Sequence, residues 1–283
     1  MTTLFKSLID DEEIRQGDII KKRGEGSTSP TYGFILTADC DIAQSKAKNH
    51  FTWLEIVTVE NYLEKVWSTE HKQVFIAKHA KLAAEQLTAA LKKVSPELSA
   101  LEKNGVVAWI EESGAADIIN KIYSREISED DISKKLKAIE LLLKNTEQKS
   151  EIERLTMAYE LVGSSKDTLY GEAKKSLSSG GGFPDYFQVP ELPSTSGYGF
   201  VVLLRHIQSI NGSSIFTSEA TARINDKPND FFRIGRFSDG IRFAVSQKLS
   251  FLFSRIGMHP SFERDCSESL NIALDELFKK ETN

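Results

Sequence analysis

The sequence has no long hydrophobic run. Its longest uninterrupted stretch of aliphatic and aromatic residues is Phe200–Leu204, whereas a membrane-spanning helix needs about 20 apolar residues. The N-terminal segment, MTTLFKSLIDDEEIRQ, lacks the basic start and the following apolar stretch that are typical of a signal peptide. We therefore expect no membrane contact and a cytoplasmic protein.

Cysteine is scarce as well. The two cysteines, Cys40 and Cys266, stand in dissimilar settings, which argues against a disulfide framework and favours a reducing compartment. Neither lies in a CxxC pair, and none of the five histidines has HExxH spacing. The sequence therefore shows no zinc site and no evident cofactor.

Strong catalytic motifs are missing. There is no GxSxG nucleophile elbow, and the glycine-rich SSGGGF at 178–183 lacks the lysine of a phosphate-binding loop. The net charge of −5, with 40% hydrophobic and 27% charged residues, is ordinary for a globular protein. It argues against a protein that coats nucleic acid with its whole surface. Whether the protein is an enzyme stays open.

The pattern of apolar residues changes twice along the chain, from strand-like to helical and back. Short β-like runs occur at 16–22, 32–44 and 51–59, and they return at 197–210. Between them, apolar residues recur at helical spacing, as in Ile132, Leu136, Ile139 and Leu143. Asn211-Gly212 predicts a hairpin between the preceding strand and residues 214–217.

This alternation predicts an α+β protein. We expect a small antiparallel β-barrel or curled sheet built from both ends of the chain, residues 1–65 plus 183–283, with an inserted helical lobe at 66–178. The SLSSGGG segment at 176–182 predicts a flexible joint. Whether the two β regions share one sheet stays open. Two helices should end the chain, with apolar faces formed by Ile241, Val245, Leu249, Leu252, Phe253 and Ile256, and by Leu270, Leu274, Leu277 and Phe278.

Asp39-Cys40-Asp41 is the clearest candidate for a metal or catalytic site. On an extended segment the two aspartates would point to the same side and could hold Mg²⁺ or act as a general base. Glu55, on a neighbouring strand, would be a third acid. The alternative is a turn after a buried strand, because aspartate favours turns, with Cys40 as a small buried residue.

A basic cluster follows the second β region. Between residues 223 and 264 there are eight cations against four acids, and six of the eight are arginine, the residue best suited to bidentate phosphate contacts. Interleaved phenylalanines could stack on bases. The alternative is ion pairing within the protein or with a partner. The predicted phosphate-binding residues are Arg233, Arg236, Arg242, Lys248 and Arg255.

The front of the chain resembles a known family. GDII at 17–20, GFILTADCDIA at 33–43 and the strand FTWLEIVTV resemble small SH3-like barrels of the plasmid-toxin type, the MazF/PemK-like ribonucleases and their non-catalytic relatives. The front, together with SQKLSFLFSRIGMHP at 246–260, is also similar to poorly characterised prokaryotic proteins associated with defence or mobile elements. The resemblance implies the barrel. It would place Arg23 and Thr37 near the family's arginine and threonine, but the chain is much longer than those ribonucleases.

The leading functional prediction is a binding or regulatory component of a prokaryotic multi-protein system, of the anti-phage defence or toxin–antitoxin type. It would have a protein partner or form a homo-oligomer. One alternative is a metal-dependent nuclease or nucleic-acid-binding protein that uses Asp39, Asp41 and Glu55. Another is a scaffold whose C-terminal helices pack on a partner, against the simpler expectation that these helices pack on the protein's own core.

Overall fold

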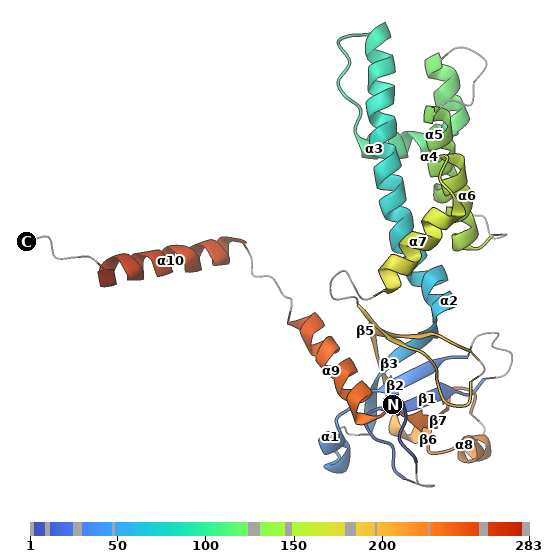
Figure 1. The fold of residues 1–283 in the computed structure, drawn as a ribbon, viewed down its shortest axis with the longest axis vertical. Coiled ribbons are helices and arrows are strands. Elements are labelled where there is room, and N and C mark those ends of the chain that lie inside the picture. The colour runs from blue at the N-terminus through green and yellow to red at the C-terminus, as the bar shows by residue number, and fades with distance from the viewer. Residues whose placement is uncertain are drawn as a thin grey trace, which may run out of the picture.

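The computed structural model describes residues 3–8, 12–24, 30–46, 49–123, 131–144, 149–178, 185–195, 197–225, 227–254 and 260–278. A β-rich body lies at one end of the molecule and a long helical lobe rises from it (Figure 1). The C-terminal helices leave the body on one side. The chain is an α+β protein, as the sequence predicts.

Strands from both ends of the chain form one seven-stranded sheet. Its order is β4-β5-β3-β2-β1-β7-β6, so the two β regions do share a sheet. The strands are β1 (Asp18–Lys22), β2 (Tyr32–Ile35), β3 (His50–Thr58), β4 (Tyr186–Val189), β5 (Phe200–Asn211), β6 (Ile215–Phe216) and β7 (Phe231–Arg236). Across the described residues the sheet stays open between β4 and β6, so a closed barrel is not what forms.

The sheet is mixed, and the predicted hairpin at Asn211-Gly212 is wrong. β6 pairs in parallel with β7, whereas all the other neighbours are antiparallel. The Asn211 side chain accepts a hydrogen bond from the Ser213 backbone N–H at 2.9 Å. It thereby starts a short 3₁₀ turn, Gly212–Ser214, that sends the chain away from β5.

This turn requires the sheet to curl. Five strand spacings separate β5 from β6, or about 24 Å in a flat sheet. The chain from Asn211 to Ile215 can span at most roughly 14 Å. Ile210 and Ile215 accordingly pack with Ile35, Trp53 and Phe231 in one cluster inside the curl.

The other face of the sheet carries a separate core. Phe34, Leu54 and Val202 pack there with Val245 and Leu249, which lie on helix α9 (Asp239–Phe253). Alternate residues of a strand point to opposite faces, so Leu54 and Trp53 serve the two different cores. Alternate residues of β3 therefore contribute to the cores on both faces of the sheet.

The helical lobe is inserted between β3 and β4. It begins with α2 (Val59–Tyr62) and a π-helical turn (Leu63–Trp67). It continues through α3 (Ser68–Val94), α4 (Lys103–Tyr123), α5 (Asp131–Leu143), α6 (Glu151–Leu161) and α7 (Lys166–Leu177). α3 is about 40 Å long and forms the spine of the lobe (Figure 1). The predicted flexible joint lies mostly outside the described residues.

Lobe and body share one hydrophobic core. Tyr62 of the lobe and Tyr186 of β4 pack with ring centroids 5.1 Å apart, and the lobe core continues into Val201 and Leu203 of β5. Buried polar contacts fix the helices within the lobe. The Glu64 carboxylate accepts backbone hydrogen bonds from Glu151 at 2.5 Å and Ile152 at 3.2 Å, at the start of α6.

We predict a pH-dependent loss of stability centred on His79. Its side chain is buried against Phe75. Burial, helped by Lys78 and Lys135 and opposed by Asp131, lowers the pKa of His79 to about 4. The unfolded chain binds this proton near pH 6.5, so the free energy of unfolding should fall as the pH drops from 6.5 towards 4, by roughly 3 kcal/mol in all. Urea titrations measure the free energy of unfolding at pH 6.5 and at pH 5. The difference between these two values should be smaller for His79→Phe than for the wild type. An equal difference in the two proteins would contradict this prediction.

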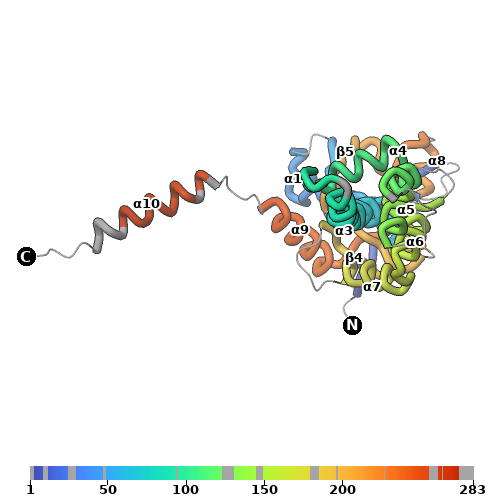
Figure 2. The backbone as a smooth tube through the Cα atoms, turned by 90° about the horizontal axis from the view of Figure 1, so that it is seen from above, coloured from blue at the N-terminus to red at the C-terminus, as the bar shows by residue number. Residues whose placement is uncertain are grey.

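The short helix α8 (Glu219–Asn225) lies between β6 and β7 in the sequence. Two helices, α9 and α10 (Pro260–Phe278), then end the described chain. α9 lies along the body, whereas α10 stands away from it (Figures 1 and 2). Among the described residues, no helix combines the length and the apolar character needed to cross a membrane.

Candidate functional site

The predicted metal site does not assemble. Asp39 and Asp41 do not follow a strand in extended conformation, because they lie in the short helix α1 (Asp39–Ala43). Two positions apart on a helix, their side chains diverge by about 200°. Asp39 accepts hydrogen bonds from the Gln16 backbone at 2.9 Å and from Arg242 at 2.5 Å. Its carboxylate therefore holds α1 and α9 to the sheet.

Glu55 lies apart from both aspartates. It pairs with His206 of β5 at 3.2 Å, at an irregularity in the β3–β5 register. It shares the face of β3 with Trp53, whereas Thr52 points towards α1 on the other face. Within the described residues, no three His, Cys, Asp or Glu side chains lie close enough to hold a metal ion. The prediction of Mg²⁺ thus finds no ligand set there.

The structure places Arg233 and Arg236 in the interior. Both side chains are almost fully buried beside Asp18, which is 0% exposed. Arg236 donates to Asp18 at 2.5 Å and to Glu12 at 2.7 Å, and Arg233 donates to Asp18 at 3.4 Å. Burial raises the pKa of Asp18, and the hydrogen bond from Arg236 opposes this shift. These guanidinium groups tie the N-terminal segment to β7 and are not on the surface to meet phosphates.

Arg242 and Lys248 are also engaged within the chain. Arg242 bonds Asp39 and Asp239 and stacks over Phe243 at 4.7 Å. The Lys248 ammonium lies 5.9 Å from the ring centroid of Tyr186 and 5.6 Å from that of Phe187, and burial lowers the pKa of Lys248. Arg255 lies outside the described residues. The basic cluster of the sequence is thus mostly a set of internal contacts.

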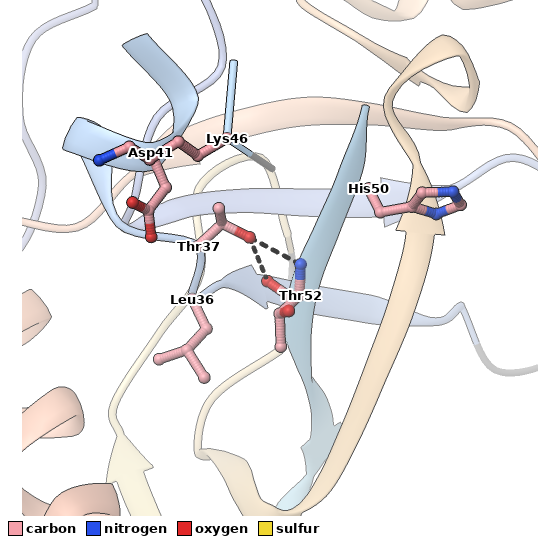
Figure 3. A pocket seen from close by; sticks show the side chains of 6 residues that line it. All are labelled: Leu36, Thr37, Asp41, Lys46, His50 and Thr52. Atoms are coloured by element: carbon pink, nitrogen blue, oxygen red, sulfur yellow. Dashed lines mark hydrogen bonds between the residues drawn. The ribbon is translucent and has the colours of Figure 1, made fainter. Parts of the chain in front are cut away.

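Arg23 and Thr37 do not form the pair that the family resemblance implies. Arg23 follows the last residue of β1 and donates to the Ala222 carbonyl at 3.2 Å. Thr37 follows β2, which runs antiparallel to β1, so the two lie at opposite ends of the hairpin, about 20 Å apart along the strands. The Thr37 hydroxyl accepts the Thr52 backbone N–H at 2.7 Å (Figure 3). It extends the pairing of β2 and β3 beyond Ile35.

Thr37 also lines an open pocket of about 370 Å³ between α1 and β3. Figure 3 shows its side chains, which come from Leu36, Thr37, Asp41, Lys46, His50 and Thr52. Both threonines are engaged in strand pairing, and His50 points away from Asp41 (Figure 3). Asp41 and His50 therefore do not form an acid–base pair in this pocket.

The C-terminal helices carry several exposed apolar side chains. Hydrophobic side chains that are 42–60% exposed gather in α9 and α10: Phe243, Phe251, Phe253, Phe262, Leu270 and Ile272. Every described side chain from Arg264 to Ala273 is exposed. Exposed apolar side chains grouped on one part of a protein mark candidate interaction sites. We call these two helices the C-terminal surface.

The two helices differ in charge. α10 contains five acids and one arginine. Among its described side chains, Arg264 and Glu268 lie opposite Phe262, Cys266 and Leu270, which are spaced four apart. In α9, by contrast, the charged residues Asp239, Arg242 and Lys248 are all engaged in contacts within the chain. The α9 residues that are exposed as whole residues are uncharged: Gly240, Phe243, Gln247, Ser250, Phe251 and Phe253. The Asp239 side chain is nevertheless 48% exposed.

Comparisons with protein-family models, with curated proteins and with solved structures gave no match. The resemblance to SH3-like barrels therefore rests on the short sequence segments alone. Part of the C-terminal surface can be recognised in the sequence. Phe243 and Phe251 fall off the buried stripe of α9, on positions where a solvent-facing helix would carry charge.

Proposed function

We propose that the protein is a non-enzymatic binding component of a multi-protein system, which docks a protein partner through α10. The observation that carries this proposal is that α10 is amphipathic, yet every described side chain from Arg264 to Ala273 is exposed. Helices gain most of their stability from packing an apolar face. The 19-residue α10, about 28 Å long, has such a face, and its described members Phe262, Cys266 and Leu270 are exposed.

The charge of α10 indicates the kind of partner. An amphipathic helix is recognised when spaced apolar anchors enter a hydrophobic groove, here Phe262, Cys266 and Leu270. Because α10 contains five acids and one arginine, it fits a groove rimmed by lysine and arginine. Two copies of α10 would repel each other, since each carries a net −4. A setting in anti-phage defence or a toxin–antitoxin pair stays a prediction from the sequence.

Capture of the partner from cells that make the protein tests this proposal. We expect Leu270→Asp to weaken capture on the order of thirtyfold, because it places a charge among the apolar anchors. Asn271→Ala, at an exposed and uncharged position on the other side of the same helix, should retain the partner. Both variants should melt at the wild-type temperature, since neither side chain is packed on the body. A partner that both variants capture as well as the wild type would show that α10 is not the docking element.

A further inference from the structure

The second half of β5 has a described strand on one side only. β4 pairs with β5 from Phe200 to Leu203, and the Leu204 N–H adds a bond to the Asp185 carbonyl at 3.0 Å. Beyond Leu204, β3 alone pairs with β5 among the described residues. The residues from Arg205 to Ser209 are all exposed. This half of β5 is therefore an open edge of the sheet.

The backbone of this open edge directs hydrogen-bonding groups outwards. Gly212 donates its N–H to the Asn49 carbonyl at 2.6 Å, on the side of β3. In an antiparallel pair, alternate residues direct their N–H and C=O groups to the same neighbour, so Gln208, which lies four positions earlier, also faces β3. Ile207 and Ser209 then direct their groups away from β3, to the side where β4 has ended. A further strand can bond to them there.

The other edges of the sheet are protected against pairing, whereas this one is not. Natural sheets keep edge strands short or place charge and proline in them. β4 has four residues and is followed by Pro190, and β6 has two. In β5, residues 207–211 contain neither charge nor proline, and Ile207 is 41% exposed. The basic residues before them, Arg205 and His206, already pair with acids of the same chain.

We infer that the protein forms a two-fold symmetric dimer in which the open edges of two β5 strands pair antiparallel about Gln208. In this register Ile207 of each copy lies opposite Ser209 of the other, and each such pair exchanges both N–H···O bonds. The two Gln208 side chains lie directly opposite each other and can hydrogen-bond through their amides. Residues 205–211 of one copy thus cover residues 205–211 of the other, so the second β5 ends where β4 begins.

The surroundings of the open edge favour a second copy as its occupant. The register brings no like charges together, because Arg205 lies opposite Asn211 and the residues between them carry no acid or further arginine or lysine. Antiparallel pairing also keeps the helical lobes apart. The lobe packs on the first half of β5, at Val201 and Leu203, so the two lobes would project from opposite ends of the joined strands (Figure 1).

The contact covers little apolar surface, which predicts a reversible dimer. Ile207 is the large hydrophobic residue that the open edge leaves exposed, and most of the contact consists of backbone hydrogen bonds. Interfaces of small area are typically weak and transient. We therefore expect a dissociation constant on the order of 10 µM.

A charge swap at Gln208 tests both the contact and its register. Light scattering measures the mass of the purified full chain over roughly a hundredfold range of concentration around the expected dissociation constant. Wild type should shift from monomer to dimer. Gln208→Glu alone and Gln208→Lys alone should each stay monomeric, because each meets its own charge across the axis, and an equal mixture of the two should regain the dimer. Gln73→Glu, at an exposed glutamine of α3, should dimerise like the wild type.

Ser209→Pro tests the part played by the backbone. Proline has no N–H to donate, and it is tolerated on an edge strand where the N–H would face solvent. Because Ser209 directs its backbone groups away from β3, the variant should keep the pairing of β3 with β5 and a melting temperature close to that of the wild type. It should be monomeric over the same range of concentration. The charge swap at Gln208 does not depend on this tolerance for proline.

The inference is overturned by a wild type that is monomeric throughout, by single charge variants that still dimerise, or by a mixture that does not regain the dimer. A monomeric wild type whose captured partner is lost in Ser209→Pro would show that the edge takes a strand of another protein instead. The test is independent of the docking role of α10. Leu270→Asp should leave the dimer intact, and Gln208→Glu should still capture a partner through α10.

Discussion

We expect Asp18→Ala to lower the free energy of unfolding by about 3–5 kcal/mol, because it leaves two buried guanidinium groups without their shared carboxylate. Arg236 and Arg233 lie beside Asp18 with side chains 7% and 3% exposed. The change also removes the acceptor for the Arg15 backbone N–H, which is 2.9 Å from the carboxylate. Chemical denaturation at neutral pH measures the effect.

Glu219→Ala is the matched control for this prediction. Glu219 also pairs with a basic group, Arg223, but both side chains are exposed, at 52% and 69%. Water screens such a pair, so its loss should cost less than about 1 kcal/mol. If the two alanine variants lost equal stability, the buried network would not hold β1, β7 and the N-terminal segment together. Arg233 and Arg236 would then again be candidates for a ligand site.

The second large effect is expected from Gly33→Ala, at about 3 kcal/mol of destabilisation. Gly33 lies on β2 beneath the Trp53 ring. A Cβ atom there would lie 2.5 Å from Cε3 of Trp53 and 3.0 Å from Cγ1 of Ile20. Trp53 also packs on Phe231 with ring centroids 5.3 Å apart, so it cannot move without opening the core inside the curl. Thermal unfolding followed by tryptophan fluorescence would report the loss.

Gly105→Ala should have the opposite effect on stability. Gly105 lies in α4, and nothing lies within 4 Å of the Cβ that alanine would add. Alanine favours the helix over glycine, so this variant should gain about 0.5–1 kcal/mol. Equal losses at Gly33 and Gly105 would mean that the contact with Trp53 does not determine the effect.

The division of the fold was predictable because it depends on local period. The alternation in β3 and the apolar stripe of α5 are properties of neighbouring residues, and they predicted strand and helix correctly. The curl was not predictable in the same way. It follows from a short turn after Asn211 combined with a strand order that only long-range pairing establishes.

The site predictions failed where they depended on contacts distant in sequence. Counting charges between residues 223 and 264 shows an excess of cations, but the partners of Arg236 are Glu12 and Asp18, more than 200 residues earlier. Asp39 likewise meets Arg242 across 203 positions. Phosphate-binding and ion-paired arginines look alike in a sequence, since both use the same planar group.

The docking role proposed for α10 depends on one feature of the fold. α10 must be unpacked against its own body, as Figures 1 and 2 show it. This is the central claim.

Hydrogen exchange on the isolated full-length protein tests the claim most directly. We predict that amides from Arg264 to Ala273 exchange at least about a hundredfold faster than buried amides of α3, because an exposed helix without packing opens freely. Addition of a partner that binds α10 should slow them. If the amides from Arg264 to Ala273 were protected in the isolated protein as strongly as those of Ala80 to Leu87 in α3, α10 would pack on its own core. That result would contradict the docking function.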